Sequence, residues 1–183
     1  MRYNQLMKIM ILVGSADADS HSFHLGQTIQ TELKSLNQEA ELINLVEYGL
    51  PLYNRSIERQ EAFDEKTRSF LDRSLEMDAF VWVTPIYHNS YSAMLKNALD
   101  WHHSTKFPGR IVGIASNGGS RSPQAADQLT LVARSQHMMT IPTRVCTLED
   151  DYDENLNLSN ESIKERIKKF AGELVDITGK MRG

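Results

Sequence analysis

Residues 79–101 read Ala-Phe-Val-Trp-Val-Thr-Pro-Ile-Tyr-His-Asn-Ser-Tyr-Ser-Ala-Met-Leu-Lys-Asn-Ala-Leu-Asp-Trp, and this stretch decides the fold. The segment before Pro85 is apolar or β-branched and too short for a helix, which predicts a strand buried on both faces of a parallel sheet. Pro85 ends this strand, and apolar residues then recur at helical spacing as far as Trp101. The loop 85–90 is therefore expected at the carboxyl end of a strand, where open α/β sheets bind ligands.

Alternating strand and helix patterns extend over the whole chain. The predicted strands are 8–13, 40–45, 79–84, 110–115 and 138–148. The predicted helices are 25–37, 58–77, 91–101, one that begins at Pro123 and one that Ser159 caps. This alternation predicts a five-stranded parallel sheet with helices on both faces. Pro142 interrupts the last strand, which predicts an edge position, and the acidic segment 148–154 is expected to be a solvated loop.

Length and composition limit the possible classes of protein. A chain of 183 residues with 40% apolar residues favours a single domain over residues 1–183. The net charge of −4 and the lack of a basic block argue against nucleic-acid binding. No apolar run is long enough to span a membrane, and the first eight residues lack the apolar core of a signal peptide. We therefore expect a cytoplasmic protein, which agrees with the presence of only one cysteine, Cys146.

Residues 84–101 resemble the segment P-x-Y-x-x-S/G-x-x-x-x-L-K-N-A-x-D-W of NAD(P)H-dependent FMN reductases, a flavodoxin-like family that includes quinone and azo-compound reductases. The wider similarity extends from Lys8 to about Cys146. The resemblance implies a three-layer α/β/α sandwich with strand order 2-1-3-4-5. It also implies FMN as cofactor, NADPH or NADH as co-substrate, a small-molecule electron acceptor, and a homodimer or homotetramer.

The loop that follows the first predicted strand, residues 14–22, places hydroxyls and small residues before a helix, where free amides can hold a phosphate. It has neither the third glycine of a dinucleotide fingerprint nor the Gly-Lys of a P-loop. Against the family pattern G-S-x-R-x-x-S-x-N, Gly14, Ser15 and Ser20 match, whereas Asp17 stands at the arginine position and Ser22 at the asparagine position. The alternative is that Ser20 only caps the helix.

A second and a third loop are expected at the same edge of the sheet. By resemblance, the second loop wraps the flavin ring and ribityl chain, although Tyr87 could equally be an aromatic that caps the core. In the third loop, Gly118 and Gly119 let backbone approach a flat ring, with their amides near the pyrimidine; an ordinary turn is the alternative. The candidate FMN contacts are Ser15, Asp17, Ser20, Ser22, Phe23, Pro85, Ile86, Tyr87, His88, Asn89, Ser90, Ser116, Asn117, Gly118 and Gly119.

No catalytic side chain and no metal site are predicted. The flavin itself supplies the chemistry, so no acid, base or nucleophile is required. His102 and His103 are adjacent at a helix end and point in different directions, and nothing orients His137 and Cys146 as a catalytic pair. Trp82 is expected in the core, and Trp101 either in the core or in a subunit contact.

The favoured function is transfer of hydride from a nicotinamide to flavin N5 and of electrons onward to a quinone, azo compound, flavin, nitroaromatic compound or metal oxyanion. One alternative is a flavodoxin-type electron carrier, although a net charge of −4 is far from the strongly acidic surface of such carriers. Another is a phospho-accepting signalling domain, which would need acidic residues where Gly14-Ser15 and Thr84-Pro85 stand.

Overall fold

The structure is a computed structural model that describes residues 6–182, so the first five residues of the expected lead-in lie outside it. Its strands are β1 (Lys8–Val13), β2 (Glu39–Asn44), β3 (Ala79–Pro85), β4 (Ile111–Asn117), β5 (Met139–Thr140) and β6 (Val145–Thr147). The sheet order is β2-β1-β3-β4-β5, every pairing is parallel, and β6 also pairs with β4. The predicted flavodoxin-like order is thus confirmed. The single last strand predicted at 138–148 is wrong, because Pro142 separates two short strands that both pair with β4.

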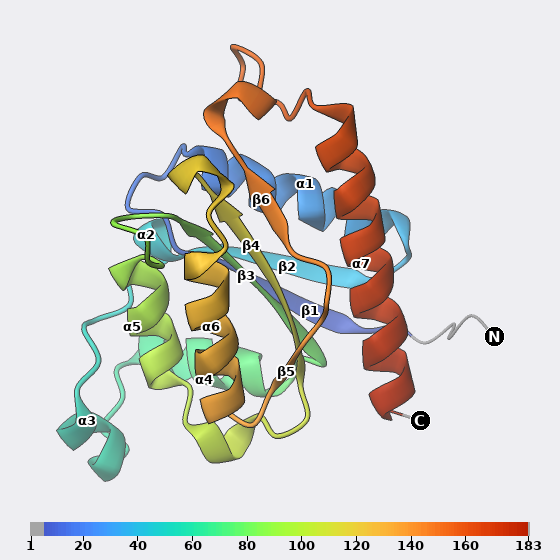
Figure 1. The fold of residues 1–183 in the computed structure, drawn as a ribbon. Coiled ribbons are helices and arrows are strands. Elements are labelled where there is room, and N and C mark those ends of the chain that lie inside the picture. Colours follow the sequence, from blue (N-terminus) through green and yellow to red (C-terminus); the bar gives the residue numbers. More distant parts are fainter. Residues whose placement is uncertain (1–5, 183) are drawn as a thin grey trace.

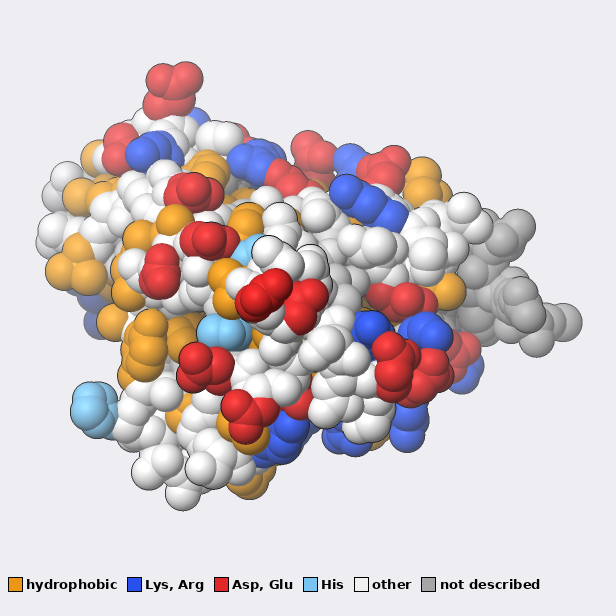
Figure 2. Space-filling view, turned by 90° about the horizontal axis from the view of Figure 1, so that it is seen from above, with side chains coloured by type: hydrophobic (Ala, Val, Ile, Leu, Met, Phe, Trp, Pro, Cys, Tyr) orange, Lys and Arg blue, Asp and Glu red, His pale blue; other side chains and the backbone are white. Residues whose placement is uncertain are grey.

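The helices are α1 (His21–Ser35), α2 (Leu45–Tyr48), α3 (Arg55–Gln60), α4 (Glu65–Leu75), α5 (Ala93–Trp101), α6 (Gln124–Ser135) and α7 (Glu161–Arg182). Helices α1 and α7 cover one face of the sheet, and α4, α5 and α6 cover the other (Figure 1). Each face has its own apolar core, with Phe170 in one and Trp82 in the other, both fully buried. The space-filling view in Figure 2 shows acidic side chains across its centre and basic side chains in small separate groups.

The helix predicted at 58–77 is wrong, because two N-caps divide this region. The Asn54 side chain accepts hydrogen bonds at the start of α3, and Asp64 accepts one from the Thr67 amide at 2.7 Å at the start of α4. In α4, Phe70 is fully buried, whereas Leu75 is 41% exposed.

Smaller boundary errors have similar causes. Asn160 caps α7 in place of Ser159, since its side chain accepts a hydrogen bond from the Ser162 amide at 3.0 Å. Ser92 caps α5, so Tyr91 precedes that helix, and Pro123 lies just before α6. Within residues 6–182, no helix has the length and apolar character needed to cross a bilayer.

The two tryptophans have different surroundings. Trp82 is fully buried in β3, as predicted. Trp101 is also buried and donates its indole N–H to the Pro51 carbonyl at 3.0 Å, while the Asn97 side chain accepts a hydrogen bond from the Tyr53 amide at 2.7 Å. Trp101 therefore packs in the core of its own chain, where it helps to fix the loop before α3.

Candidate functional site

The loops that follow β1, β3 and β4 meet at the carboxyl edge of the sheet. The Gly14 amide donates to the Val83 carbonyl at 2.9 Å, and the Ser92 hydroxyl donates to the Gly14 carbonyl. The Ile86 amide donates to the Asn117 carbonyl at 2.8 Å. Hydrogen bonds therefore link the loop after β1 to the β3 region, and the loop after β3 to the end of β4.

The loop after β1 leaves donors unused at the start of α1. Ser20 is the N-cap, and its hydroxyl oxygen accepts a hydrogen bond from the Phe23 amide at 3.2 Å. Among the described residues, the amides of His21 and Ser22 have no backbone or side-chain acceptor, and the buried Ser22 hydroxyl has no partner. An N-terminus with free amides and an unpaired hydroxyl suits a phosphate group, so this part of the chain fits FMN.

Asp17, at the family's arginine position, belongs to a local turn. Its carboxylate accepts a hydrogen bond from the Asp19 amide at 3.2 Å, and its own amide donates to the Ser15 hydroxyl at 3.1 Å. Asp17 is exposed, whereas Ser15 is buried. Phe23 is partly buried and packs against the core on the α1 side of the sheet.

The loop after β3 is a tight turn with Tyr87 and Ser90 at its ends. The two residues exchange backbone hydrogen bonds of 3.0 and 2.9 Å, and His88 and Asn89 between them have φ values of 50° and 62°. These features define a type I′ turn. The Gln128 side chain accepts from the Ser90 hydroxyl at 2.6 Å and donates to the Asn89 carbonyl at 3.2 Å, which fixes the turn to α6. Tyr87 is 45% exposed, so it does not cap the core.

The loop after β4 holds four consecutive residues in the left-handed region, with φ values from 52° to 97° over residues 118–121. Ser120 and Arg121 are strained in this conformation, since L side chains rarely adopt it. A Cβ on Gly118 would enter open space, whereas one on Gly119 would approach Cγ2 of Ile86 at 2.7 Å. The Gly118 amide already donates to the Thr147 carbonyl at 2.8 Å, so any amide donor to a flavin must come from its neighbours.

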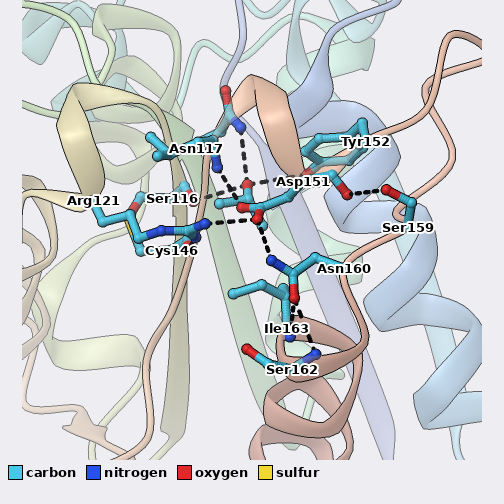
Figure 3. A network of polar contacts seen from close by, with 12 residues as sticks. Ser116, Asn117, Arg121, Cys146, Asp151, Tyr152, Ser159, Asn160, Ser162 and Ile163 are labelled. Atoms are coloured by element: carbon cyan, nitrogen blue, oxygen red, sulfur yellow. Dashed lines mark hydrogen bonds and ion pairs between the residues drawn. The ribbon is translucent and has the colours of Figure 1, made fainter.

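Asp151 holds this strained loop in place. It is 1% exposed and accepts hydrogen bonds from Arg121 at 2.6 Å, from the Leu148 amide at 2.7 Å and from the Asn160 side chain at 2.7 Å. Figure 3 shows Arg121, from the loop after β4, and Asn160, at the start of α7, converging on Asp151. The predicted solvated loop at 148–154 is therefore wrong for Asp151 and for Tyr152, which is 8% exposed.

The charge states follow from these contacts. Burial by itself raises the pKa of Asp151, but the hydrogen bonds from Arg121, the Leu148 amide and Asn160 outweigh it, so the pKa lies below its usual value. Burial raises the pKa of Tyr152 to about 12. Its neutral hydroxyl donates to the His21 carbonyl at 3.1 Å and also lies 3.0 Å from Thr147 Oγ1. Tyr152 thereby connects the start of α1 to the end of β6.

Sequence reasoning missed Arg121, Asp151 and Tyr152. The acidic run 149–151 is typical of an exposed loop, and nothing local shows that one of its carboxylates is buried. The only local signal was Asn160, which caps a long amphipathic helix. The start of this helix lies close to Asp151, because the Asn160 side chain donates a hydrogen bond to the Asp151 carboxylate.

The other titratable groups have structural surroundings. His102 is fully enclosed and stacks on Phe70 with ring centroids 5.0 Å apart, and burial lowers its pKa to about 3. Burial also raises the pKa of the Cys146 thiol, which accepts a hydrogen bond from the Ser116 hydroxyl at 3.3 Å. Among the described residues, no group of His, Cys, Asp and Glu is placed to hold a metal ion.

Comparison with known proteins agrees with this geometry. A model of the family NADPH-dependent FMN reductase matches residues 7–153. The chain is 30% identical over 178 residues to an FMN-dependent NADPH-azoreductase of Staphylococcus saprophyticus, covering 92% of this chain and 94% of that protein. It is 28% identical over 176 residues to the protein of the same name from Staphylococcus aureus USA300, with coverage of 92% and 94%.

Among solved structures, FerB of Paracoccus denitrificans, a flavoenzyme NAD(P)H:(acceptor) oxidoreductase, matches with a TM-score of 0.79 at 22% identity, covering 96% of this chain and 98% of that one. This likeness shows the fold, and the family match covers all three loops of the candidate site. The chain thus belongs to the NADPH-dependent FMN reductase family and is an NAD(P)H-dependent oxidoreductase with FMN as its flavin.

Proposed function

We propose that this protein binds FMN across the loops after β1, β3 and β4 and passes electrons from NAD(P)H to a small, flat acceptor such as an azo compound or a quinone. The observation that carries the proposal is the meeting of these loops at one edge, with free amides and an unpaired Ser22 hydroxyl at the start of α1. We further propose that the chain acts as one domain, residues 1–183, within a homodimer or homotetramer in the cytoplasm.

Each loop has its own role in this proposal. Ser15, Ser20, Ser22 and the first amides of α1 hold the phosphate. Residues 85–90 contact the ring and ribityl chain, and residues 116–119 contact the pyrimidine edge. FMN, when bound, supplies the capacity to accept hydride and release electrons, so the protein supplies binding, orientation and electrostatics. Phe23 and Asp17 contribute to the shape and charge of the phosphate loop.

The nature of the acceptor is inferred from the relatives and the surface. Two similar proteins are named as azoreductases, and FerB is named for a general acceptor. The turn 87–90 leaves Tyr87, His88 and Asn89 exposed beside the predicted ring, and an exposed aromatic can stack on a flat acceptor. An electron carrier without nicotinamide turnover is the less favoured function, because the matched family is one of reductases.

Cofactor exchange and rapid kinetics test the proposal together. We expect the purified protein to release FMN on heating, and the reloaded protein to lose its flavin absorbance when mixed with NADPH or NADH. Addition of an azo dye or a quinone should restore the absorbance. FAD in place of FMN would contradict the cofactor assignment, and a flavin that stays oxidised with both nicotinamides would identify a carrier.

A further inference from the structure

A cleft of about 480 Å³ opens beside the loop after β4, along the β6 side of the sheet. Three arginines and three serines provide its polar lining: Arg121, Arg144, Arg166, Ser116, Ser122 and Ser162. These residues come from β4, from the segments before α6 and β6, and from the first two turns of α7. Figure 3 shows Ser116, Arg121, Cys146 and Ser162 in this region.

The charge of the cleft differs from that of the rest of the protein. The chain has a net charge of −4, and three other clefts are each lined by at least one glutamate. Among the residues that the structure describes, no carboxylate lines this cleft, which we call the arginine cleft. Asp151 binds Arg121 at 2.6 Å and Asp127 binds Arg144 at 2.5 Å, but neither aspartate is part of the lining.

Arg166 supplies the uncompensated charge. Its Nε donates to the Arg144 carbonyl oxygen, and within residues 6–182 it has no carboxylate partner. Burial raises the pKa of the Cys146 thiol, so this group adds no negative charge to the lining. Ser122 precedes α6 and Ser162 lies in the first turn of α7, so the positive ends of two helix dipoles also lie at the cleft.

We propose that this cleft binds a phosphate monoester, the 2′-phosphate of NADPH, and so determines the preference for NADPH over NADH. The proposal rests on the proposed function. Guanidinium groups bind phosphate oxygens through paired hydrogen bonds, and Arg166 is free to do so. Ser116, near the end of β4, and Arg121, in the loop after β4, both line the cleft, so a phosphate held here lies beside the predicted flavin site.

Calorimetry of the FMN-loaded protein tests the cleft without turnover. Adenosine 2′,5′-bisphosphate should bind at least about tenfold more tightly than adenosine 5′-monophosphate, the gain typical of hydrogen bonds between charged groups. Arg166→Gln should remove most of this difference, and Arg166→Lys should restore part of it. The control is Arg134→Gln on α6, which removes the same charge from an exposed residue outside the cleft and should change nothing.

Kinetics provide the second readout. Arg166→Gln and Arg144→Gln should raise KM for NADPH about tenfold or more and leave KM for NADH within about twofold. Equal affinity of the parent protein for both adenosine nucleotides would overturn the proposal, as would an equal rise in KM for NADPH and for NADH in the variants. If the cleft binds inorganic phosphate but the parent does not prefer either nicotinamide, the proposal is also wrong. If neither nicotinamide is oxidised, the proposed function fails, whereas calorimetry still decides whether the cleft recognises a 2′-phosphate.

Discussion

The loop after β1 and the loop after β4 face the same edge of the sheet, but different kinds of contact hold them. In the first, the Ser15, Asp17 and Ser20 side chains accept hydrogen bonds from amides two or three residues further along the chain. In the second, Arg121 binds Asp151 and the Gly118 amide binds Thr147, about 30 residues away in sequence. Distant residues also anchor the first loop, through the bonds from Gly14 to Val83 and from Asn44 to Ala18, but its own side chains close its turns. The second loop depends on the fold around it.

This difference predicts where mutations act at a distance. A change of Ser15, Asp17 or Ser20 should alter phosphate binding with little effect elsewhere, because these side chains accept hydrogen bonds from amides of the same segment. A change in the segment 147–160 should disturb the loop after β4 although no residue of that segment is predicted to touch the flavin. The following predictions are ordered from the largest expected effect to the smallest.

Asp151→Ala should have the largest effect. It leaves the Arg121 guanidinium and the Leu148 amide without their buried acceptor, and we expect a loss of about 2–4 kcal/mol in the free energy of unfolding. Flavin affinity should fall as well, because Arg121 no longer holds residues 118–121. Urea unfolding and FMN titration measure the two effects. The exposed Glu154→Gln, in the same loop, is the control and should change neither. Unchanged FMN affinity in Asp151→Ala would show that the two regions are independent.

Gly119→Val should act on the loop after β4 directly. A side chain here is strained at φ +59° and meets Ile86, which displaces the backbone from the ring. We expect about 1–3 kcal/mol of strain and weaker FMN binding. Gly109→Val is a matched control, because Gly109 also has a positive φ, of 76°, but open space around it and no place in the site. It should lower stability and leave FMN affinity unchanged. Equal FMN affinity in both variants would remove the loop after β4 from the site.

His102 should make stability depend on pH in a region remote from both loops. Burial lowers the pKa of His102 to about 3. When the pH falls below the ordinary pKa of histidine, the unfolded chain therefore takes up a proton that the folded chain does not. The resulting loss is about 2 kcal/mol on going from pH 7 to pH 5.

The Asp151 carboxylate behaves differently, because its pKa lies below the ordinary value and its contribution to stability stays intact until the pH falls through that value. Urea unfolding of the parent and of His102→Phe at pH 7 and pH 5 measures the contribution of His102. If the free energy of unfolding falls as much in the variant as in the parent, another group causes the acid sensitivity.

Ser20→Ala and Asp17→Arg should have the smallest and most local effects. Removal of the Ser20 hydroxyl takes away a helix cap and the proposed phosphate ligand, and FMN binding should weaken by about 1–2 kcal/mol. Asp17→Arg should tighten FMN binding and make it more sensitive to salt, because the new ion pair is exposed. Titration of the apoprotein at two ionic strengths measures both changes. Riboflavin, which has no phosphate, is the control ligand and should respond to neither substitution; equal affinity of the parent for riboflavin and FMN would exclude a phosphate site here.

The sequence patterns were sufficient for a parallel sheet with helices on both faces and for the three loops, and the family resemblance supplied the sheet order. Alternation of strand and helix patterns is a local property, and Pro85 marks the end of β3 directly. The positions of Ser15, Ser20, Gly118 and Gly119 at strand ends followed from these patterns and from the family resemblance. The helix boundaries did not follow from the sequence in the same way. Asn and Asp can cap a helix or lie inside one, and only the structure shows that Asn54 and Asp64 begin α3 and α4.

Only the tertiary structure decided which charged residues support the site. Burial of Asp151 depends on α7 packing beside β6, which brings Asn160 and Leu148 around the carboxylate, and no pattern near residue 151 contains this information. The arginine cleft likewise joins residues from four segments, with Arg121 and Arg166 45 positions apart in the numbering. Short-range order and apolar periodicity can be read along the chain, because their causes lie within a few residues of each other. The choice between a solvated and a buried charge depends on partners that only the folded chain brings together.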